Sequence, residues 1–166
     1  MYRVRTPGYR KRDPAMRWAL PDRAFFACGA CHVLAAAHLE RFGAGTAQAL
    51  ALVPAPGFTG SHVVVAGEGW IFDYHGYAER DGYLAHTFAK ARRWWPGWDA
   101  ALVPVPFEAL VSEAESRKIP GLRLRAPDQF LHDALPRARA YLDRFAHPPG
   151  AVRLRRGKEV NTRSPL

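Results

Sequence analysis

The chain has 166 residues, of which 48% are hydrophobic and 23% charged, values typical of one globular domain with a single core rather than of a disordered chain. No apolar run approaches the roughly 18 residues that a membrane-spanning helix needs, and two cysteines are too few for a disulfide scaffold. No apolar segment follows the basic N-terminus, so we expect no secretory signal and a cytoplasmic location, with a secreted effector left open.

The net charge of +9 is concentrated at the two ends of the chain. Residues 1–17 hold six basic residues and one acidic residue, and residues 151–166 hold five and one, so the stretch between them is neutral. We predict a basic extended arm over residues 1–22, a single domain over 23–150 and a basic C-terminal tail over 151–166. No nucleic-acid-binding motif accompanies the charge, so we expect solvated ends and no nucleic-acid partner. The oligomeric state stays open.

Hydrophobic spacing and turn residues predict an α+β fold, in which a helix packs on a small antiparallel sheet and further helices follow towards the C-terminus. Gly43 is a natural stop for the first long helix, and Pro104 favours an edge position for the last strand. In chain order we expect a helix over 29–42, strands over 49–53, 62–66 and 70–74, a helix over 82–94, a strand over 101–105 and helices over 107–118 and 134–146. Tryptophans 94, 95 and 98 indicate either core or a lid over a cleft.

Cys31 falls in the first turn of the helix expected over 29–42. Unpaired backbone N–H groups and the positive end of the helix dipole favour an anion at that position, which lowers the pKa of a thiol. Gly29 allows a tight turn into the helix. Cys31 is therefore a candidate nucleophile.

The hairpin after residue 61 supplies a candidate base. With Gly67-Glu68 as a two-residue turn, His62 lies directly opposite Asp73 on one face, with Cβ atoms about 5 Å apart. A three-residue loop would break this pairing. An aspartate beside a histidine fixes its tautomer and stabilises the imidazolium. The sequence thus predicts Cys31, His62 and Asp73 as nucleophile, base and orienting residue.

The run Cys28-Gly29-Ala30-Cys31 resembles the C-G-[SA]-C signature at the catalytic cysteine of papain-like proteases. Together with His62 and Asp73, residues 25–76 resemble the papain-like superfamily, most closely its compact bacterial members of the NlpC/P60 or transglutaminase-like type. The resemblance implies a papain-like fold and a thiol protease, amidase or acyl transferase that attacks an amide or ester and forms a thioester.

The same resemblance implies a catalytic triad of Cys31, His62 and Asp73, a peptide or small amide or ester as substrate, and no metal or organic cofactor. The chain departs from the papain pattern because no glutamine precedes the cysteine to complete an oxyanion hole. Trp18 and Arg23 are candidates for the missing donor.

Cys28 and Cys31 are also compatible with functions other than hydrolysis or acyl transfer. A C-x-x-C pair at a helix start is typical of thiol–disulfide redox modules, and the same cysteines with His62 and His75 could bind zinc. Cys28 to His32 matches the C-x-x-C-H pattern of haem attachment, although no methionine follows it as an axial ligand. A binding protein without catalytic activity that uses its basic ends is a further alternative.

Overall fold

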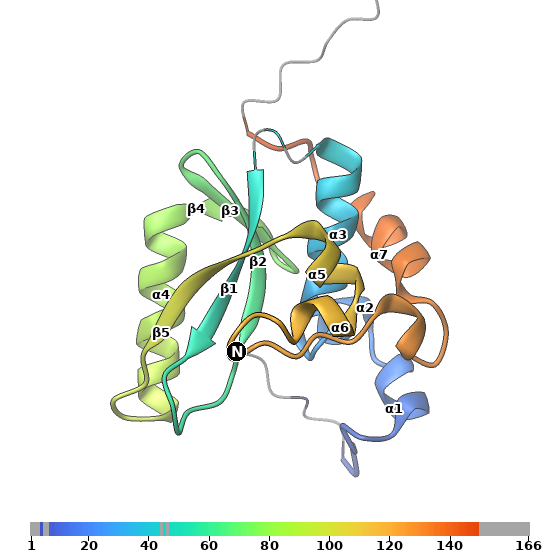
Figure 1. Cartoon of the computed structure of the whole chain (residues 1–166), viewed down its shortest axis with the longest axis horizontal. Helices are drawn as coiled ribbons and strands as arrows, with labels where there is room; N and C mark the ends of the chain where they lie inside the picture. The colour runs from blue at the N-terminus through green and yellow to red at the C-terminus, as the bar shows by residue number, and fades with distance from the viewer. Residues whose placement is uncertain (1–3, 5–6, 44, 46, 150–166) are drawn as a thin grey trace, which may run out of the picture.

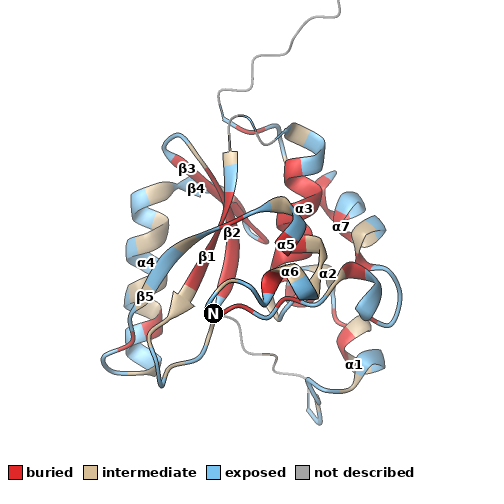
Figure 2. Ribbon diagram, in the orientation of Figure 1, coloured by how far each residue is buried: buried red, intermediate tan, exposed pale blue. Residues whose placement is uncertain are grey.

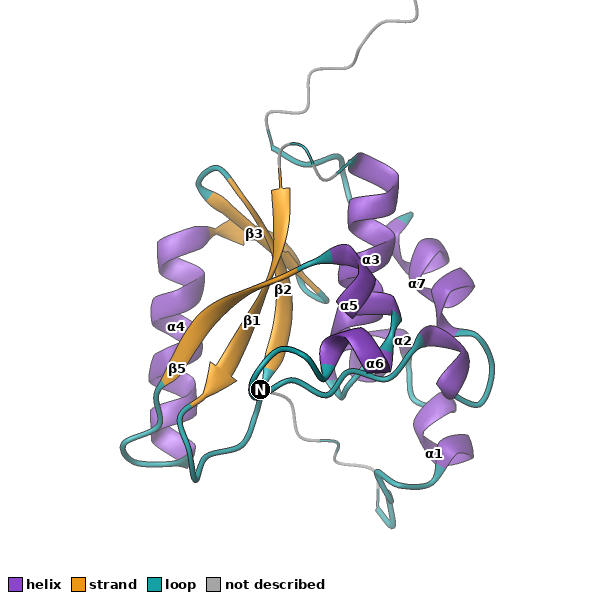
Figure 3. Ribbon diagram, viewed as in Figure 1, coloured by secondary structure: helices purple, strands orange, loops and turns teal. Residues whose placement is uncertain are grey.

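The computed structural model describes residues 4, 7–43, 45 and 47–149. It is an α+β structure built on one five-stranded antiparallel sheet with helices on both faces (Figure 1, Figure 3). The strands are β1 (Ala47–Pro54), β2 (His62–Gly67), β3 (Trp70–Asp73), β4 (Gly76–Glu79) and β5 (Ala100–Val105). The helices are α1 (Pro14–Trp18), α2 (Asp22–Ala27), α3 (Cys31–Phe42), α4 (Arg80–Trp94), α5 (Phe107–Val111), α6 (Glu113–Ser116), the 3₁₀ helix η1 (Pro127–Gln129) and α7 (Ala134–Leu142). Across these described segments, no helix has both the length and the apolar character needed to cross a bilayer.

The strands occur in the order β4-β3-β2-β1-β5, and the two faces of the sheet carry separate apolar clusters. Val63 and Val65 of β2 belong to the cluster on the α3 side, whereas Val64 and Ala66 belong to the cluster beneath α4 (Figure 1). Because both faces are covered, β2 is a continuous apolar run whose residues are almost all buried (Figure 2). The α3 side holds the main core, against which α5 and α7 also pack.

The structure confirms the predicted strands and the helices over 29–42 and 82–94, with small changes at their ends. The position of β5 at the sheet edge is also confirmed. The single helix expected over 107–118 is wrong: Ser112 has extended backbone angles there, and its side chain accepts from the N–H of Glu115 to begin α6. The helix expected over 134–146 ends at Leu142.

The N-terminal segment is less extended than predicted. Pro14 to Trp18 form α1, because proline suits the first helical turn and Asp13 accepts a 2.9 Å hydrogen bond from the N–H of Met16. Leu20 is buried in the core, so this part of the expected arm belongs to the folded domain. The basic tail expected over 151–166 lies outside the described residues.

The β2–β3 hairpin differs in register from the prediction. Val65 pairs with Phe72 rather than with Trp70, a displacement of two residues. His62 is therefore diagonal to Asp73 and not directly opposite it. Because side chains alternate along a strand, an even displacement leaves both residues on the same face.

The cause of this displacement is the choice of turn residues. The observed pairing places Glu68 and Gly69 at the turn, and Gly69 has a positive φ of 70°. Gly67 instead belongs to β2, where the ring of Trp70 lies so close that a Cβ would overlap it. The glycine expected in the turn is thus required in the strand.

Gly76 was predicted to end the hairpin, but it begins β4. The Oδ1 of Asp73 accepts a 2.7 Å hydrogen bond from the N–H of His75, a side-chain-to-backbone turn typical of aspartate. Gly76 follows with φ of 105°, and Asp73 then pairs with Gly76 in the ladder. Asp73 consequently lies at a tight turn between two strands.

Candidate active site

A cleft of about 590 Å³ opens beside the N-terminus of α3. It is lined by Cys28, Cys31 and His32, by residues 59–63 that lead into β2, and by residues 122–125. Trp94 and Trp95 also line it, whereas Trp98 is buried and donates from Nε1 to the carbonyl of Thr59 at 2.9 Å. The tryptophan cluster is therefore divided between the cleft and the core.

Cys31 is the first residue of α3. The N–H groups of Val33 and Leu34 both donate to the carbonyl of Ala30, as expected for a helix that begins at Cys31. The N–H of Val63, on β2, points to the Sγ of Cys31 at 3.4 Å. This donor and the start of the helix both favour a thiolate at this position.

His62 and Asp73 are in contact, as the sequence predicted, although through a diagonal arrangement. The Nε2 of His62 lies 3.3 Å from the Oδ2 of Asp73. Because a carboxylate can only accept, Nε2 carries a proton, which leaves Nδ1 as the ring nitrogen for exchange with Cys31. His62 is the first residue of β2, so it can contact α3 residues as well as the turn that carries Asp73.

The side chains of Cys31, His62 and Asp73 shift one another's pKa values. Burial opposes ionisation of Cys31, but the charge of His62 and hydrogen bonds from His32 and His62 place its pKa well below the ordinary thiol value. Burial also opposes protonation of His62, yet Cys31 and Asp73 raise its pKa to about 9. Burial would raise the pKa of Asp73, but hydrogen bonds from His62, His75 and Tyr83 hold it far below its usual range. Together these shifts favour a thiolate, an imidazolium and a carboxylate in the site.

Cys28 differs from Cys31. It caps the C-terminal end of α2, and burial raises its pKa despite the nearby charges of Lys11 and Arg17. The two described cysteines are not joined in a disulfide. Among the described residues, no three or more His, Cys, Asp or Glu side chains are grouped as a metal site would require. Burial thus favours the thiol form of Cys28, whereas the surroundings of Cys31 favour the thiolate.

Several residues of the site lacked a sequence signal. Tyr83 of α4 donates a 2.7 Å hydrogen bond to Asp73, a contact that required the packing of a distant helix. His32 is buried, and its Nε2 lies 2.7 Å from the carbonyl of Arg125. Trp18 and Arg23, proposed from the sequence as oxyanion donors, are not among the described residues that line the cleft.

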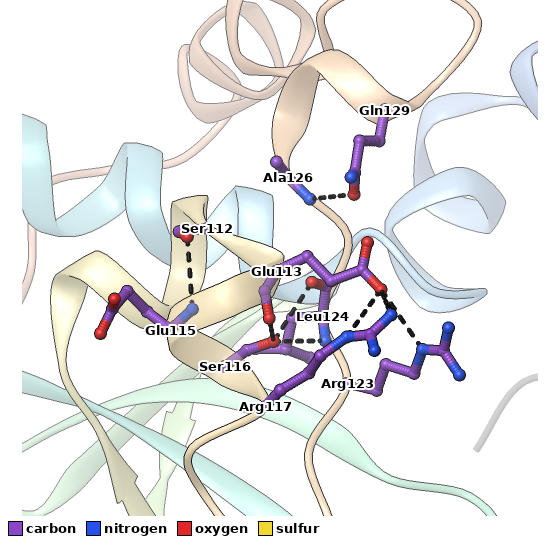
Figure 4. A network of polar contacts seen from close by, with 9 residues as sticks. All are labelled: Ser112, Glu113, Glu115, Ser116, Arg117, Arg123, Leu124, Ala126 and Gln129. Carbon is purple, nitrogen blue, oxygen red and sulfur yellow. Dashed lines mark hydrogen bonds and ion pairs between the residues drawn. The ribbon is translucent and has the colours of Figure 1, made fainter.

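The wall formed by residues 122–125 is anchored by the polar contacts of Ser116 (Figure 4), a fully buried residue. The Oγ of Ser116 accepts from the N–H of Leu124 at 2.9 Å and donates to the carbonyl of Glu113 at 2.9 Å. Glu113 in turn forms an ion pair with Arg123 at 3.3 Å (Figure 4). This network fixes the wall that receives His32.

Comparisons with protein-family models, curated proteins and solved structures found no match for this chain.

Proposed function

We propose that the protein is a cysteine-dependent hydrolase or acyl transferase that acts on an amide or ester. The single observation that supports this most strongly is the position of His62 between the other two residues. Its Nε2 contacts Asp73, and its ring interacts with Cys31 through a hydrogen bond and through opposite charge. An acceptor carboxylate, an imidazole and a thiol at a helix N-terminus form the arrangement that activates a cysteine nucleophile. We further propose that α3 on this antiparallel sheet represents a compact papain-like fold.

In the proposed reaction, the Cys31 thiolate attacks the carbonyl carbon of the substrate, and the carbonyl oxygen becomes an oxyanion. The backbone N–H of Cys31, at the start of α3, is the proposed donor to that charge. The oxyanion collapses, the bond to the leaving nitrogen or oxygen breaks, and the Nδ1 of His62 gives its proton to the leaving group.

A thioester on Cys31 and a neutral His62 remain. His62 then accepts a proton from water or from an acceptor amine as that group attacks the thioester. The product acid or amide leaves, and the Cys31 thiolate and His62 imidazolium are restored. Asp73 is a positioning residue here, because it holds the ring of His62 and stabilises its charge.

The activation of Cys31 by a histidine that is paired with a carboxylate supports this function over a thiol–disulfide module. The groups that lower the pKa of Cys31 are His62 and His32, whereas the pKa of Cys28 is raised. A hydrolase needs one activated thiol, and Cys28 then has no part in the chemistry.

The test is the alkylation of Cys31 by iodoacetamide as a function of pH. We expect fast reaction below pH 7 in the wild type and in Cys28→Ser. At pH 6 an ordinary thiol is ionised to well under about 1%, so His62→Ala should react at least about tenfold more slowly. A second measurement uses 4-nitrophenyl acetate, with mass spectrometry to detect an acyl group on Cys31. Dependence of the alkylation rate on Cys28, or no acyl adduct on Cys31, would contradict the proposal.

A further inference from the structure

Arg17 is a buried arginine on the wall of the cleft. Only 7% of the residue is exposed, and one of its terminal nitrogens lies 3.9 Å from the position that a Cβ on Gly29 would occupy. Its Nε is buried and has no hydrogen-bond partner among the described residues. Its guanidinium packs 5.9 Å from the centre of the Phe130 ring. Arg17 therefore lies close to the segment that leads into Cys31, and no carboxylate of the described residues is hydrogen-bonded to it.

Two other arginines near the site have their own partners. Arg123 pairs with Glu113 (Figure 4), and Arg137 donates to Asp22 and to two backbone carbonyls. By contrast, the described residues that line the cleft include Lys11, Arg17, Arg123 and Arg125 but no Asp or Glu. Of these four basic side chains, only Arg123 forms an ion pair with a carboxylate among the described residues.

A second polar atom on the same wall is also without a partner. The hydroxyl of Tyr9 is buried and makes no hydrogen bond to the described residues, and Tyr9 lines the cleft. Buried polar groups are almost always hydrogen-bonded in folded proteins, and a buried charge without a partner is costly. The Tyr9 hydroxyl and the Arg17 Nε, both without a partner among the described residues, indicate a ligand that supplies acceptor oxygens.

We propose that the substrate carries a carboxylate that Arg17 binds, with the hydroxyl of Tyr9 as an additional donor. This inference rests on the proposed function, since it names the class of amide or ester that Cys31 attacks. A guanidinium offers a planar fork of donors that matches a carboxylate. The ring of Phe130 packs against the Arg17 guanidinium. Because Arg17 lies beside Gly29, a carboxylate bound to it would lie close to the segment that leads into Cys31.

The test compares two alkylating reagents that differ only in charge, N-iodoacetylglycine and N-iodoacetylglycinamide. Both react at the same carbon, so the ratio of their rates with Cys31 isolates recognition of the carboxylate. The ratio of the rate with N-iodoacetylglycine to the rate with N-iodoacetylglycinamide should be higher for wild-type Cys31 than for glutathione. In Arg17→Met that preference should fall by about tenfold or more, as expected for loss of a charge-assisted hydrogen bond. Tyr9→Phe should reduce the preference by a smaller factor.

Arg12→Met is the matched control. Arg12 is exposed, lies on the same segment and does not line the cleft, so its loss changes the net charge equally without changing the ratio. Arg17→Met should also have a melting temperature at least equal to that of the wild type, because it removes an unsatisfied buried charge and keeps an apolar stem over Phe130. If Arg17→Met does not fold, Arg17→Lys keeps the charge and should show an intermediate ratio.

The outcomes separate the two proposals. If neither reagent alkylates wild-type Cys31 faster than it alkylates glutathione, the proposed function is wrong. If both react fast but the ratio is the same in the wild type and in the Arg17 variants, the function stands and the carboxylate site is overturned. A ratio that falls equally in Arg12→Met would also overturn it, because the effect would then come from net charge alone.

Discussion

Tyr83 donates a 2.7 Å hydrogen bond to the Oδ2 of Asp73, the same oxygen that faces the Nε2 of His62. Burial and the neighbouring carboxylate both raise the pKa of Tyr83, so its hydroxyl stays protonated and acts as a donor. The N–H of His75 holds the other oxygen of Asp73 at 2.7 Å. Asp73 is thus fixed by its own turn and by α4, independently of His62.

We expect Tyr83→Phe to lower the free energy of unfolding by about 1 kcal/mol, the usual value of one hydrogen bond. Asp73 stays ionised without this bond, but its carboxylate is held less firmly, so alkylation of Cys31 at pH 6 should slow by a few-fold. Urea unfolding and iodoacetamide kinetics measure the two effects. Tyr77→Phe is the control, because it removes a hydroxyl bonded to His38 and does not contact Asp73. Equal loss of reactivity in both variants would show that Tyr83 has no positioning role.

The protonation of His62 provides a second prediction. The imidazolium should persist up to about pH 9 in the wild type. Asp73→Asn removes one group that raises this pKa and Cys31→Ala removes another, so both variants should titrate at lower pH. NMR of the imidazole nitrogens measures these values directly. An unchanged pKa in Cys31→Ala would mean that the thiolate and the imidazolium do not interact.

The sequence predicted that His62 and Asp73 come together, but it misplaced the turn between them. Side-chain alternation is robust to an even displacement, which is why both residues still share a face. The displacement itself depends on Gly67, which is needed because the ring of Trp70 covers the strand there. Such a contact belongs to tertiary packing, and local turn preferences cannot reveal it.

The burial of Arg17 likewise could not be predicted from the sequence. Six basic residues within residues 1–17 suggested a solvated arm, and average charge gave no sign that one of them is buried. The helical start at Asp13 and Pro14 is a local signal that the sequence does contain. The position of Arg17 against Phe130 depends on residues more than a hundred positions away, which no spacing pattern encodes.

The anchor of the cleft wall gives a third prediction. Ser116→Ala leaves the buried N–H of Leu124 without its acceptor, which should cost about 1–3 kcal/mol of unfolding free energy. The wall that receives His32 should loosen, with faster amide exchange over residues 122–125. The matched control is Ser112→Ala, which removes an N-cap from α6 at a cost of about 1 kcal/mol. Exchange that increases equally in both variants would show that Ser116 does not hold the wall.

His38 provides a prediction about acid stability. This residue is buried in the main core, its Nε2 contacts the hydroxyl of Tyr77 at 2.8 Å, and its Nδ1 has no partner among the described residues. Burial lowers its pKa from 6.5 to about 4. The unfolded chain therefore binds a proton before the folded chain does, so the stability present above pH 6.5 is lost as the pH falls towards 4, by about 3 kcal/mol.

His38→Gln keeps a polar group near Tyr77 but cannot titrate in this range. We measure its unfolding free energy with urea at pH 7 and at pH 4. The decrease between these two pH values should be smaller than in the wild type by about 3 kcal/mol. Carboxylates titrate in both proteins and cancel in the difference. His86→Gln, at an exposed position on α4, is the control for replacing a histidine by glutamine. Parallel curves for the wild type and His38→Gln would mean that His38 gains its proton as easily in the folded chain as in the unfolded one.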